Sequence, residues 1–252
     1  MDTKIVRYIL CRMLGVEAAL LLVPVLVAAI YQEKCGIVFL IPIVILCLLF
    51  WVVGRKRPEH GQIYGKEGMV IVALAWILWS LFGAMPFTLS GYIPSYVDAF
   101  FETVSGFTTT GSSIIPDVEV LPHCLLFWRS FTHWIGGMGV LVFVLVVTSL
   151  DRKNSMHLMR AEVPGPEKDK LVPKAMSTAR ILYGMYLTLT VIEMVFLVIG
   201  GMNLFDSMIF SFGSAGTGGF SNYADSVAHF NSAYIDGVSA HYLESILHCS
   251  IL

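Results

Sequence analysis

DAFFETVSGFTTTG occupies residues 98–111, and DSMIFSFGSAGTGG occupies residues 206–219. Each stretch opens with an aspartate, continues as a short apolar segment and ends in glycine with threonine or serine. The apolar part is too short to cross a bilayer, whose hydrocarbon core of about 30 Å needs about 20 helical residues. An internal repeat of this kind sets the frame for every other motif. The pattern predicts two half-crossing helices, each followed by a non-helical strand.

The two stretches align with an offset of 108 residues, which pairs Gly111 with Gly219. A register slipped by one, which pairs Thr110-Gly111 with Thr217-Gly218, is the alternative. We prefer the first register because it also aligns the acidic residue at the start of each short helix.

Long apolar segments surround both stretches. Of the 252 residues, 56% are hydrophobic and 13% are charged, which is about half the charged fraction of an average soluble domain. We predict an all-helical membrane protein with about six hydrophobic spans, at residues 8–30, 36–53, 69–89, 124–150, 181–200 and, less clearly apolar, 238–252. The five cysteines are scattered without partners at ligand spacing, so we expect them to pack as small apolar residues and to bind no metal.

The repeat divides the chain into four parts. An N-terminal pair of transmembrane helices covers residues 1–68, and a helix–pore loop–helix repeat covers residues 69–150. A cytoplasmic connector follows at 151–180, and a second repeat, incomplete at its C-terminal helix, covers 181–252. The first span has the charge pattern of a signal peptide, but it is too long and lacks a small-residue cleavage site, so we expect it to be retained.

Positive charges gather on one side of this map. Of the sixteen Lys and Arg residues, all but Lys34 and Arg129 lie before the first span, between the second and third, or between the fourth and fifth. The positive-inside rule therefore puts the N-terminus and both basic connectors in the cytoplasm. The outward parts carry acids instead, and we expect these to form a negative vestibule that attracts cations. The acids are Asp98, Glu102, Asp117, Glu119, Glu193, Asp206, Asp225, Asp236 and Glu244.

The glycine-rich strands suit an ion pathway. Non-helical backbone at membrane depth needs protein or a water-filled cavity around it, and its carbonyl oxygens can replace the hydration shell of an ion. Glycine lets these carbonyls turn towards the axis, and the partly negative C-terminal end of each short helix favours a cation. The alternative, that both strands are exposed linkers, is disfavoured by their recurrence in matching positions. A dinucleotide-binding loop at 216–219 is disfavoured because no buried strand precedes it and no lysine follows it.

Two charged residues stand out within the spans. Arg129 lies near the outer end of the fourth span, with His133 one turn later on the same face. An intramembrane charge is expected to have a partner, and we predict Glu102, in a bridge that fixes the first short helix; a gating role is the alternative. Glu193 could face the bundle interior, with a role in transport, or bond a neighbouring helix. Close helix contacts are expected at Gly136, Gly137 and Gly139.

These residues resemble a known family. Residues 98–111 resemble the first pore segment of the membrane, pore-forming subunit of Trk-type (Trk/Ktr) potassium transporters. Residues 127–130 and 134–139 resemble the helix after it, and residues 217–221 resemble the second filter. The resemblance extends to about Gly237 and implies helix–pore loop–helix repeats around one potassium-selective pore, four in the family and two here.

The resemblance also implies a function. Potassium would be taken up across the plasma membrane through a carbonyl-lined filter, coupled to protons or sodium, with no cofactor and with potassium as the substrate. The filter glycines would be Gly111 and Gly219, with further backbone carbonyls from Thr108, Thr109, Thr110, Gly216, Thr217 and Gly218. A cytoplasmic nucleotide-binding subunit would regulate the protein.

Two pore segments line a pore from two sides only. We therefore interpret the chain as truncated to about half the family's length and expect a second copy, or another chain, to complete the ring. The alternatives are a non-conducting membrane fragment that assembles with other chains, and an intramembrane enzyme. The enzyme is disfavoured because no cluster of His, Asp or Glu recurs at catalytic spacing within the spans. No nucleic-acid partner is expected.

Overall fold

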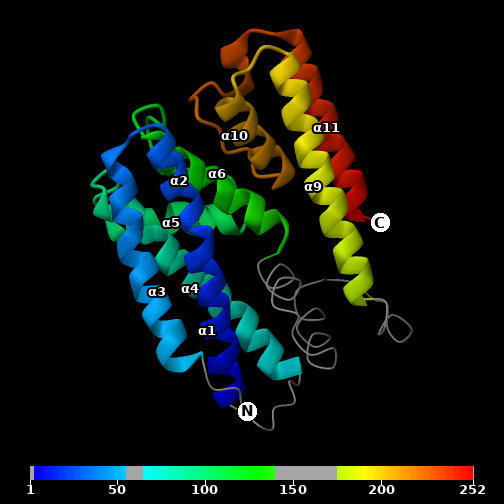
Figure 1. Cartoon of the computed structure of the whole chain (residues 1–252). Coiled ribbons are helices and arrows are strands. Elements are labelled where there is room, and N and C mark those ends of the chain that lie inside the picture. The colour runs from blue at the N-terminus through cyan, green and yellow to red at the C-terminus, as the bar shows by residue number, and fades with distance from the viewer. Residues whose placement is uncertain (1–2, 55–64, 140–174, 252) are drawn as a thin grey trace.

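The computed structural model describes residues 3–54, 65–139 and 175–251, and within these ranges its regular secondary structure is all helical, with no β-strand. The N-terminal part consists of α1 (Thr3–Leu20), α2 (Leu22–Ile30), the 3-10 helix η1 (Lys34–Phe39) and α3 (Leu40–Val53). It packs against α4 (Gly65–Leu89), with which α1 and α3 are in contact. Figure 1 shows these long helices side by side. The predicted all-helical class is confirmed.

A proline divides the first span. Pro24 cannot donate a backbone hydrogen bond and its ring crowds the preceding turn, and the helix is interrupted at Leu21. The N–H of Leu21 still donates to the carbonyl of Glu17 at 2.9 Å, so α1 and α2 continue as one apolar span from Thr3 to Ile30.

Two helical triplets follow the predicted repeat. The first is α4, α5 (Tyr96–Phe107) and α6 (His123–Gly137). The second is α9 (Ala175–Ile199), α10 (Leu204–Ala215) and α11 (Ala233–Ile251), with the 3-10 helix η2 (Ser226–Phe230) before α11. The short helix α5 packs against α4 and α6, whereas α10 packs against both α9 of its own repeat and α6 of the first (Figure 1). The two repeats are therefore joined through α6.

The two short helices begin with the same type of cap. Ser95 accepts a hydrogen bond from the N–H of Asp98, and Asn203 accepts one from the N–H of Asp206. These side chains satisfy N–H groups that a helix start leaves open, and the aspartates complement the positive end of each helix dipole. Both helices have 12 residues, and their bounds differ by the predicted 108 positions.

Aromatic side chains form the core behind the end of α5. The ring of Phe107 lies edge-on to Trp79 at 5.6 Å and to Trp128 at 6.2 Å between centroids. Trp128 is fully buried, and its indole N–H donates to the carbonyl of Gly83 at 2.9 Å. This packing fixes the point at which the chain leaves α5.

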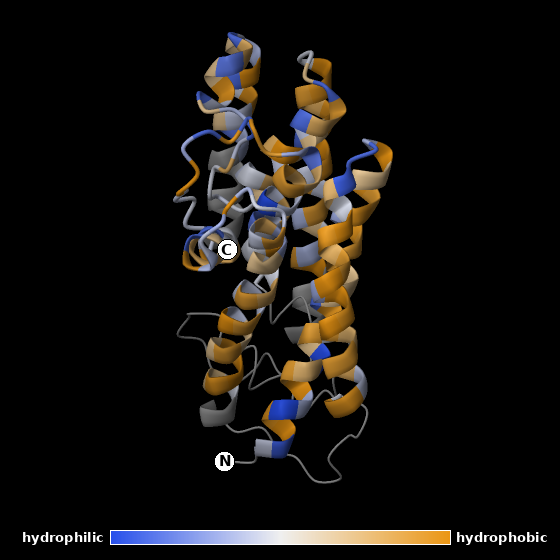
Figure 2. Cartoon of the chain, turned by 90° about the vertical axis from the view of Figure 1, so that its left-hand side faces the viewer, coloured by the Kyte–Doolittle hydropathy of each residue, from blue (hydrophilic) through white to orange (hydrophobic). Residues whose placement is uncertain are grey.

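The outer helices present apolar side chains outward. Along α9, the exposed residues include Leu182, Met185, Val195 and Phe196. Figure 2 shows hydrophobic colours along most of the long helices, with hydrophilic residues mainly towards their ends. A continuous surface of apolar side chains along long helices is suited to contact with lipid. Four helices of the described part are long and apolar enough to span a membrane: Thr3–Ile30, Lys34–Val53, Gly68–Leu89 and Ile181–Ile199.

Two helices begin before the apolar spans that they contain. Helices α4 and α9 begin at Gly65 and Ala175, whereas the spans run over Gly68–Leu89 and Ile181–Ile199, close to the predicted 69–89 and 181–200. A helix does not stop where the apolar stretch stops, because its backbone bonds are equally good in the polar interface. The second half of the predicted span 124–150 and most of the connector 151–180 lie outside the described residues.

Candidate ion-binding site

Both short helices end in the same hydrogen-bond pattern. Beyond each helix, three consecutive N–H groups donate to carbonyls of the last turn, and these bonds correspond pairwise at an offset of 108 residues. In α5 they run from Thr108 to Val104, Thr109 to Gly106 and Thr110 to Ser105, and in α10 from Gly216 to Phe212, Thr217 to Ser214 and Gly218 to Gly213. The structure therefore follows the register preferred from the sequence, not the slipped one.

The two non-helical segments that follow α5 and α10, residues 108–111 and 216–219, are called the first and second strand. Their backbone angles also repeat. Thr109 and Thr217 have φ of 54° and 56°, and Gly111 and Gly219 have φ of 77° and 78°. Left-handed backbone is unremarkable for glycine but costs a β-branched threonine about 1–2 kcal/mol. Two threonines held in this conformation at equivalent positions indicate a shape that the surrounding structure imposes. Strain of this kind gathers at functional sites.

The two strands touch each other. A β-carbon built on Gly111 would overlap the carbonyl of Gly218, so these two backbones lie in direct contact. Thr108, Thr110, Thr217 and Gly219 are exposed. The residues predicted as filter residues are thus brought together, one segment from each repeat, and four of them are exposed.

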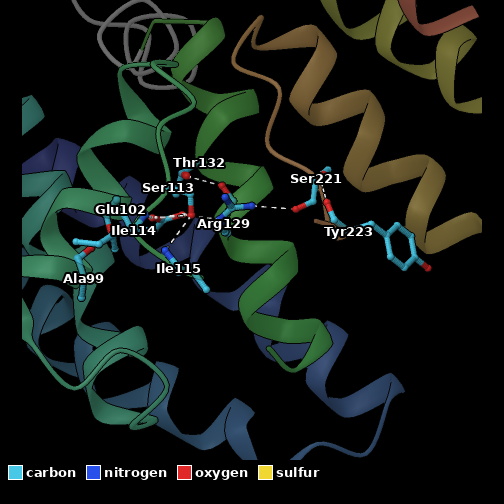
Figure 3. A network of polar contacts seen from close by, with 10 residues as sticks. Ala99, Glu102, Ser113, Ile114, Ile115, Arg129, Thr132, Ser221 and Tyr223 are labelled. Carbon is cyan, nitrogen blue, oxygen red and sulfur yellow. Dashed lines mark hydrogen bonds and ion pairs between the residues drawn. The ribbon is translucent and has the colours of Figure 1, made fainter. Parts of the chain in front are cut away.

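A buried ion pair lies behind the first strand, as Figure 3 shows. Arg129 Nε donates to Glu102 Oε1 at 2.6 Å, and the two side chains are 4% and 0% exposed. The predicted contact is therefore present. Glu102 also accepts from the hydroxyl of Ser113 at 3.0 Å and from the N–H of Ile114 at 2.9 Å. A buried pair is tolerated when further hydrogen bonds satisfy it, and here those bonds hold the chain just beyond residues 108–111.

Arg129 also reaches the second repeat. Its Nη1 donates to the carbonyl of Ser221 at 3.0 Å (Figure 3), and its Cζ lies 3.5 Å from the centroid of the Phe220 ring. A guanidinium over an aromatic face gains a cation–π attraction. One side chain of α6, through Glu102 and directly, thus connects the residues that follow both strands.

A buried aspartate holds the residues that follow the second strand. Asp206 is buried and accepts hydrogen bonds from the side-chain amides of Asn203 and Asn222 and, at 3.1 Å, from the hydroxyl of Tyr223. Burial and the nearby charge of Asp206 raise the pKa of Tyr223 to about 12, so the phenol remains a donor at neutral pH. Asp206 therefore ties the chain beyond the second strand to the start of α10.

Glycines of α6 allow close approach to both short helices. A β-carbon on Gly136 would overlap the carbonyl of Phe107, and one on Gly137 would lie 2.8 Å from the α-carbon of Gly216. The predicted close contacts at these two positions are present. Gly139 lies just beyond α6 with φ of 68°.

The expected acidic vestibule is smaller than predicted. Glu102 and Asp206 are buried and bonded as described, and Glu193 is buried against Ser214 of α10, inside the bundle. Glu102 and Asp206 turn inward because buried donors need acceptors there, whereas the carboxylate oxygens of Glu193 have no hydrogen-bond partner among the described residues. Of the predicted set, those exposed or half-exposed in the described part are Asp98, Asp117, Glu119, Asp225 and Asp236.

Comparison with known proteins agrees with this geometry. A family model described as "Cation transport protein", TrkH, matches residues 36–243. The chain belongs to the TrkH family.

Curated relatives of the family have similar sequences. The chain is 37% identical over 229 residues to the Trk system potassium uptake protein TrkH of Escherichia coli K12, covering 88% of this chain and 47% of that protein. It is 34% identical over 226 residues to an uncharacterized cation transporter of Methanocaldococcus jannaschii, covering 88% and 47%. The chain therefore spans about half the length of the curated relatives it matches.

A solved structure of the family has the same fold. The crystal structure of the potassium transporter TrkH from Vibrio parahaemolyticus aligns with a TM-score of 0.80 at 29% identity, over 96% of this chain and 49% of that one. The helix–pore loop–helix arrangement of the TrkH family is thus shared by this chain.

A contact that no sequence pattern indicated holds the start of α6. Glu33, in the polar link after α2, accepts from the N–H groups of His123 at 2.8 Å and Cys124 at 3.0 Å. It thereby caps α6, the helix that carries Arg129. These hydrogen bonds outweigh the effect of burial and lower the pKa of Glu33. The polarity of the link was visible in the sequence, but its partner lies 90 residues away.

Proposed function

We propose that this chain contributes two of the pore segments of a potassium uptake pathway. Residues 108–111 and 216–219 line a selectivity filter with their carbonyls, and the hydroxyls of the threonines add further oxygens. Potassium sheds its hydration shell into these oxygens. The chemistry is transfer of an ion without a covalent step, with potassium as substrate and no cofactor.

One observation carries the proposal. The two glycine-rich strands, from different repeats, share their left-handed positions and lie in contact. Exposed linkers have no reason to hold two threonines at positive φ in the same register. The printed names of the relatives support the same substrate, since they describe potassium uptake proteins and a potassium transporter.

Membrane topology and partners follow from the sequence. We place the N-terminus and the connector 151–180 in the cytoplasm because of their Lys and Arg residues. The 1–68 pair is proposed to buttress the pore, and the 69–150 and 181–252 repeats to form it. A second copy, or another chain, would supply the remaining sides of the filter, a cytoplasmic nucleotide-binding subunit would regulate it, and protons or sodium would be the coupling ions.

Growth of a potassium-uptake-deficient cell at low potassium tests this proposal. We expect the chain to restore growth and a Gly111→Ala variant, expressed at the same level in the membrane, to fail. Stable membrane expression of the original chain without growth would instead favour the non-conducting fragment that assembles with other chains.

A further inference from the structure

His133 lies directly behind the second filter strand. It is on α6, one turn after Arg129, and is fully buried. A β-carbon built on Gly218 would overlap its imidazole ring at Nε2 and Cδ2. The ring therefore occupies the space that a side chain would take at Gly218.

The contact extends over alternate positions of the strand. The ring of His133 lies edge-on to Phe220, with 3.9 Å between centroids, and its carbonyl oxygen lies 2.7 Å from a β-carbon built on Gly216. Positions 216, 218 and 220 therefore all lie against this one residue. His133 comes from the first repeat and supports the second.

The first strand is arranged differently. The position equivalent to Gly218 is Thr110, whose hydroxyl lies 2.8 Å from that of Thr108. Thr110 is exposed. The first strand thus carries its own side chain where the second strand has a histidine of another helix beside it.

We propose that His133 is a positioning residue for ion selectivity, setting the placement of the second filter strand. This inference rests on the proposed potassium pathway and names a residue that determines its specificity. Discrimination between potassium and sodium depends on how many carbonyl oxygens face the ion and on how they are arranged. Glycines have no side chains of their own to hold them, so a rigid ring packed against Gly218 limits how far this strand can move.

The ring of His133 supports the strand by packing. Neither ring nitrogen has a hydrogen-bond partner among the described residues, so the shape and rigidity of the ring carry the role. Glutamine is the substitution that keeps a planar polar group of similar reach, whereas alanine removes the support.

Selectivity of uptake tests the inference. The full chain is reconstituted in liposomes, and uptake of radioactive rubidium is competed with sodium and with potassium. We expect His133→Ala to reduce the preference for potassium over sodium by roughly tenfold, the effect of about 1.4 kcal/mol, and His133→Gln to keep most of it. The matched control is His241→Ala, at an exposed position of α11; it should keep the original preference.

A double variant separates positioning from general damage. Gly218→Thr gives the second strand the side chain of the first and should abolish uptake, because it collides with His133. Adding His133→Ala opens that space and should restore uptake, with altered selectivity, although each single change is harmful. A rescue of this kind is not expected if His133 only helps the protein to fold.

The outcomes distinguish a failure of the proposed role of His133 from a failure of the proposed potassium pathway. If the original chain takes up rubidium selectively and His133→Ala retains the same potassium preference, the inference about His133 is wrong and the pathway stands. If Gly218→Thr is no better tolerated with His133→Ala than without it, the inference is also wrong. If the original chain shows no uptake, the proposed function fails and the inference fails with it.

Discussion

Ser113 and Ser221 occupy equivalent places in the two repeats and are held by opposite ends of one buried ion pair. The hydroxyl of Ser113 donates to Glu102, and the carbonyl of Ser221 accepts from Arg129. Glu102 and Arg129 are themselves joined at 2.6 Å. The residues just beyond 108–111 and just beyond 216–219 are therefore linked through two side chains, so the two segments are positioned together rather than one at a time.

Removing either charge should disrupt both strands. Arg129→Gln leaves Glu102 buried without its cation, and a broken buried pair costs about 3–5 kcal/mol. We expect a large fall in the thermal stability of the purified protein and loss of uptake. Arg129→Lys should recover only part of both, because a lysine cannot reach Glu102 and Ser221 with a planar fork. Full stability in Arg129→Gln would contradict the role of the pair.

Exchanging the two charges should not restore the site. In the Glu102→Arg, Arg129→Glu double variant the ion pair could re-form, but an arginine cannot accept from Ser113 and Ile114. A glutamate likewise cannot donate to the carbonyl of Ser221. The unpaired groups would cost about 1–3 kcal/mol each. Thermal unfolding of the double variant beside both single variants measures this, and stability equal to that of the original chain would show that only the charge pair matters.

Gly111 and Gly219 should differ in their tolerance of alanine. Both have positive φ, which costs alanine about 1–2 kcal/mol. At Gly111 a β-carbon also collides with the Gly218 carbonyl, whereas at Gly219 nothing lies within 4 Å. We expect Gly111→Ala to abolish selective uptake and Gly219→Ala to be milder. Equal effects in rubidium uptake and in stability would mean that strain alone matters, without the contact between strands.

Substitutions of the aspartates in the first turns of the two short helices should have unequal effects on stability. Asp206→Asn replaces one of the two oxygens that accept from Asn203, Asn222 and Tyr223 by an NH2 group that cannot accept, and should destabilise the protein by about 1–3 kcal/mol. Asp98→Asn, at the equivalent half-exposed position, should lose only a dipole interaction of about 0.3–1 kcal/mol. Chemical denaturation of both variants in detergent compares them. A larger loss in Asp98→Asn would contradict the assignment of Asp206 as the tie for the second strand.

Stability at acid pH should depend on Glu33. Its pKa is lower in the folded protein than its ordinary value. The carboxylate therefore contributes stability that is present above the ordinary glutamate pKa of about 4.3 and is lost as the pH falls through the lower folded value. Thermal unfolding is measured between neutral pH and about pH 3. The original chain should lose the stability contributed by Glu33 over this range, and Glu33→Gln should not show that loss. The same decline in both proteins would rule out Glu33 as its source.

Local pattern was sufficient to predict the repeat and its register. Glycine, threonine and the leading aspartate mark the ends of each half-helix, because cap chemistry and left-handed backbone restrict which residues fit. The pair of Glu102 and Arg129 was also predictable, since an intramembrane arginine needs a buried partner. The first inference uses constraints that act within one short segment. The second uses the rule that a charged residue inside the membrane needs a partner.

Contacts between distant segments were not predictable in the same way. Glu33 bonds the start of α6, and His133 lies against Gly218, through packing that no sequence spacing encodes. The vestibule was overestimated for the same reason, since an acid in an outward segment can turn inward when a helix end or an amide needs an acceptor. Asp206 was recognised only as a helix-start residue, and its bonds to Asn222 and Tyr223 depend on the fold of the strand.

Thermal unfolding of the purified chain in potassium or in sodium, at constant ionic strength, tests the filter most directly. An ion that binds only the folded protein stabilises it by about 2.7 kcal/mol at a hundredfold excess over its Kd. We predict a saturable rise of Tm in potassium that exceeds the rise in sodium and disappears in Gly111→Ala. An identical Tm in the two salts, or a potassium effect that survives in Gly111→Ala, would contradict a potassium site formed by the two strands.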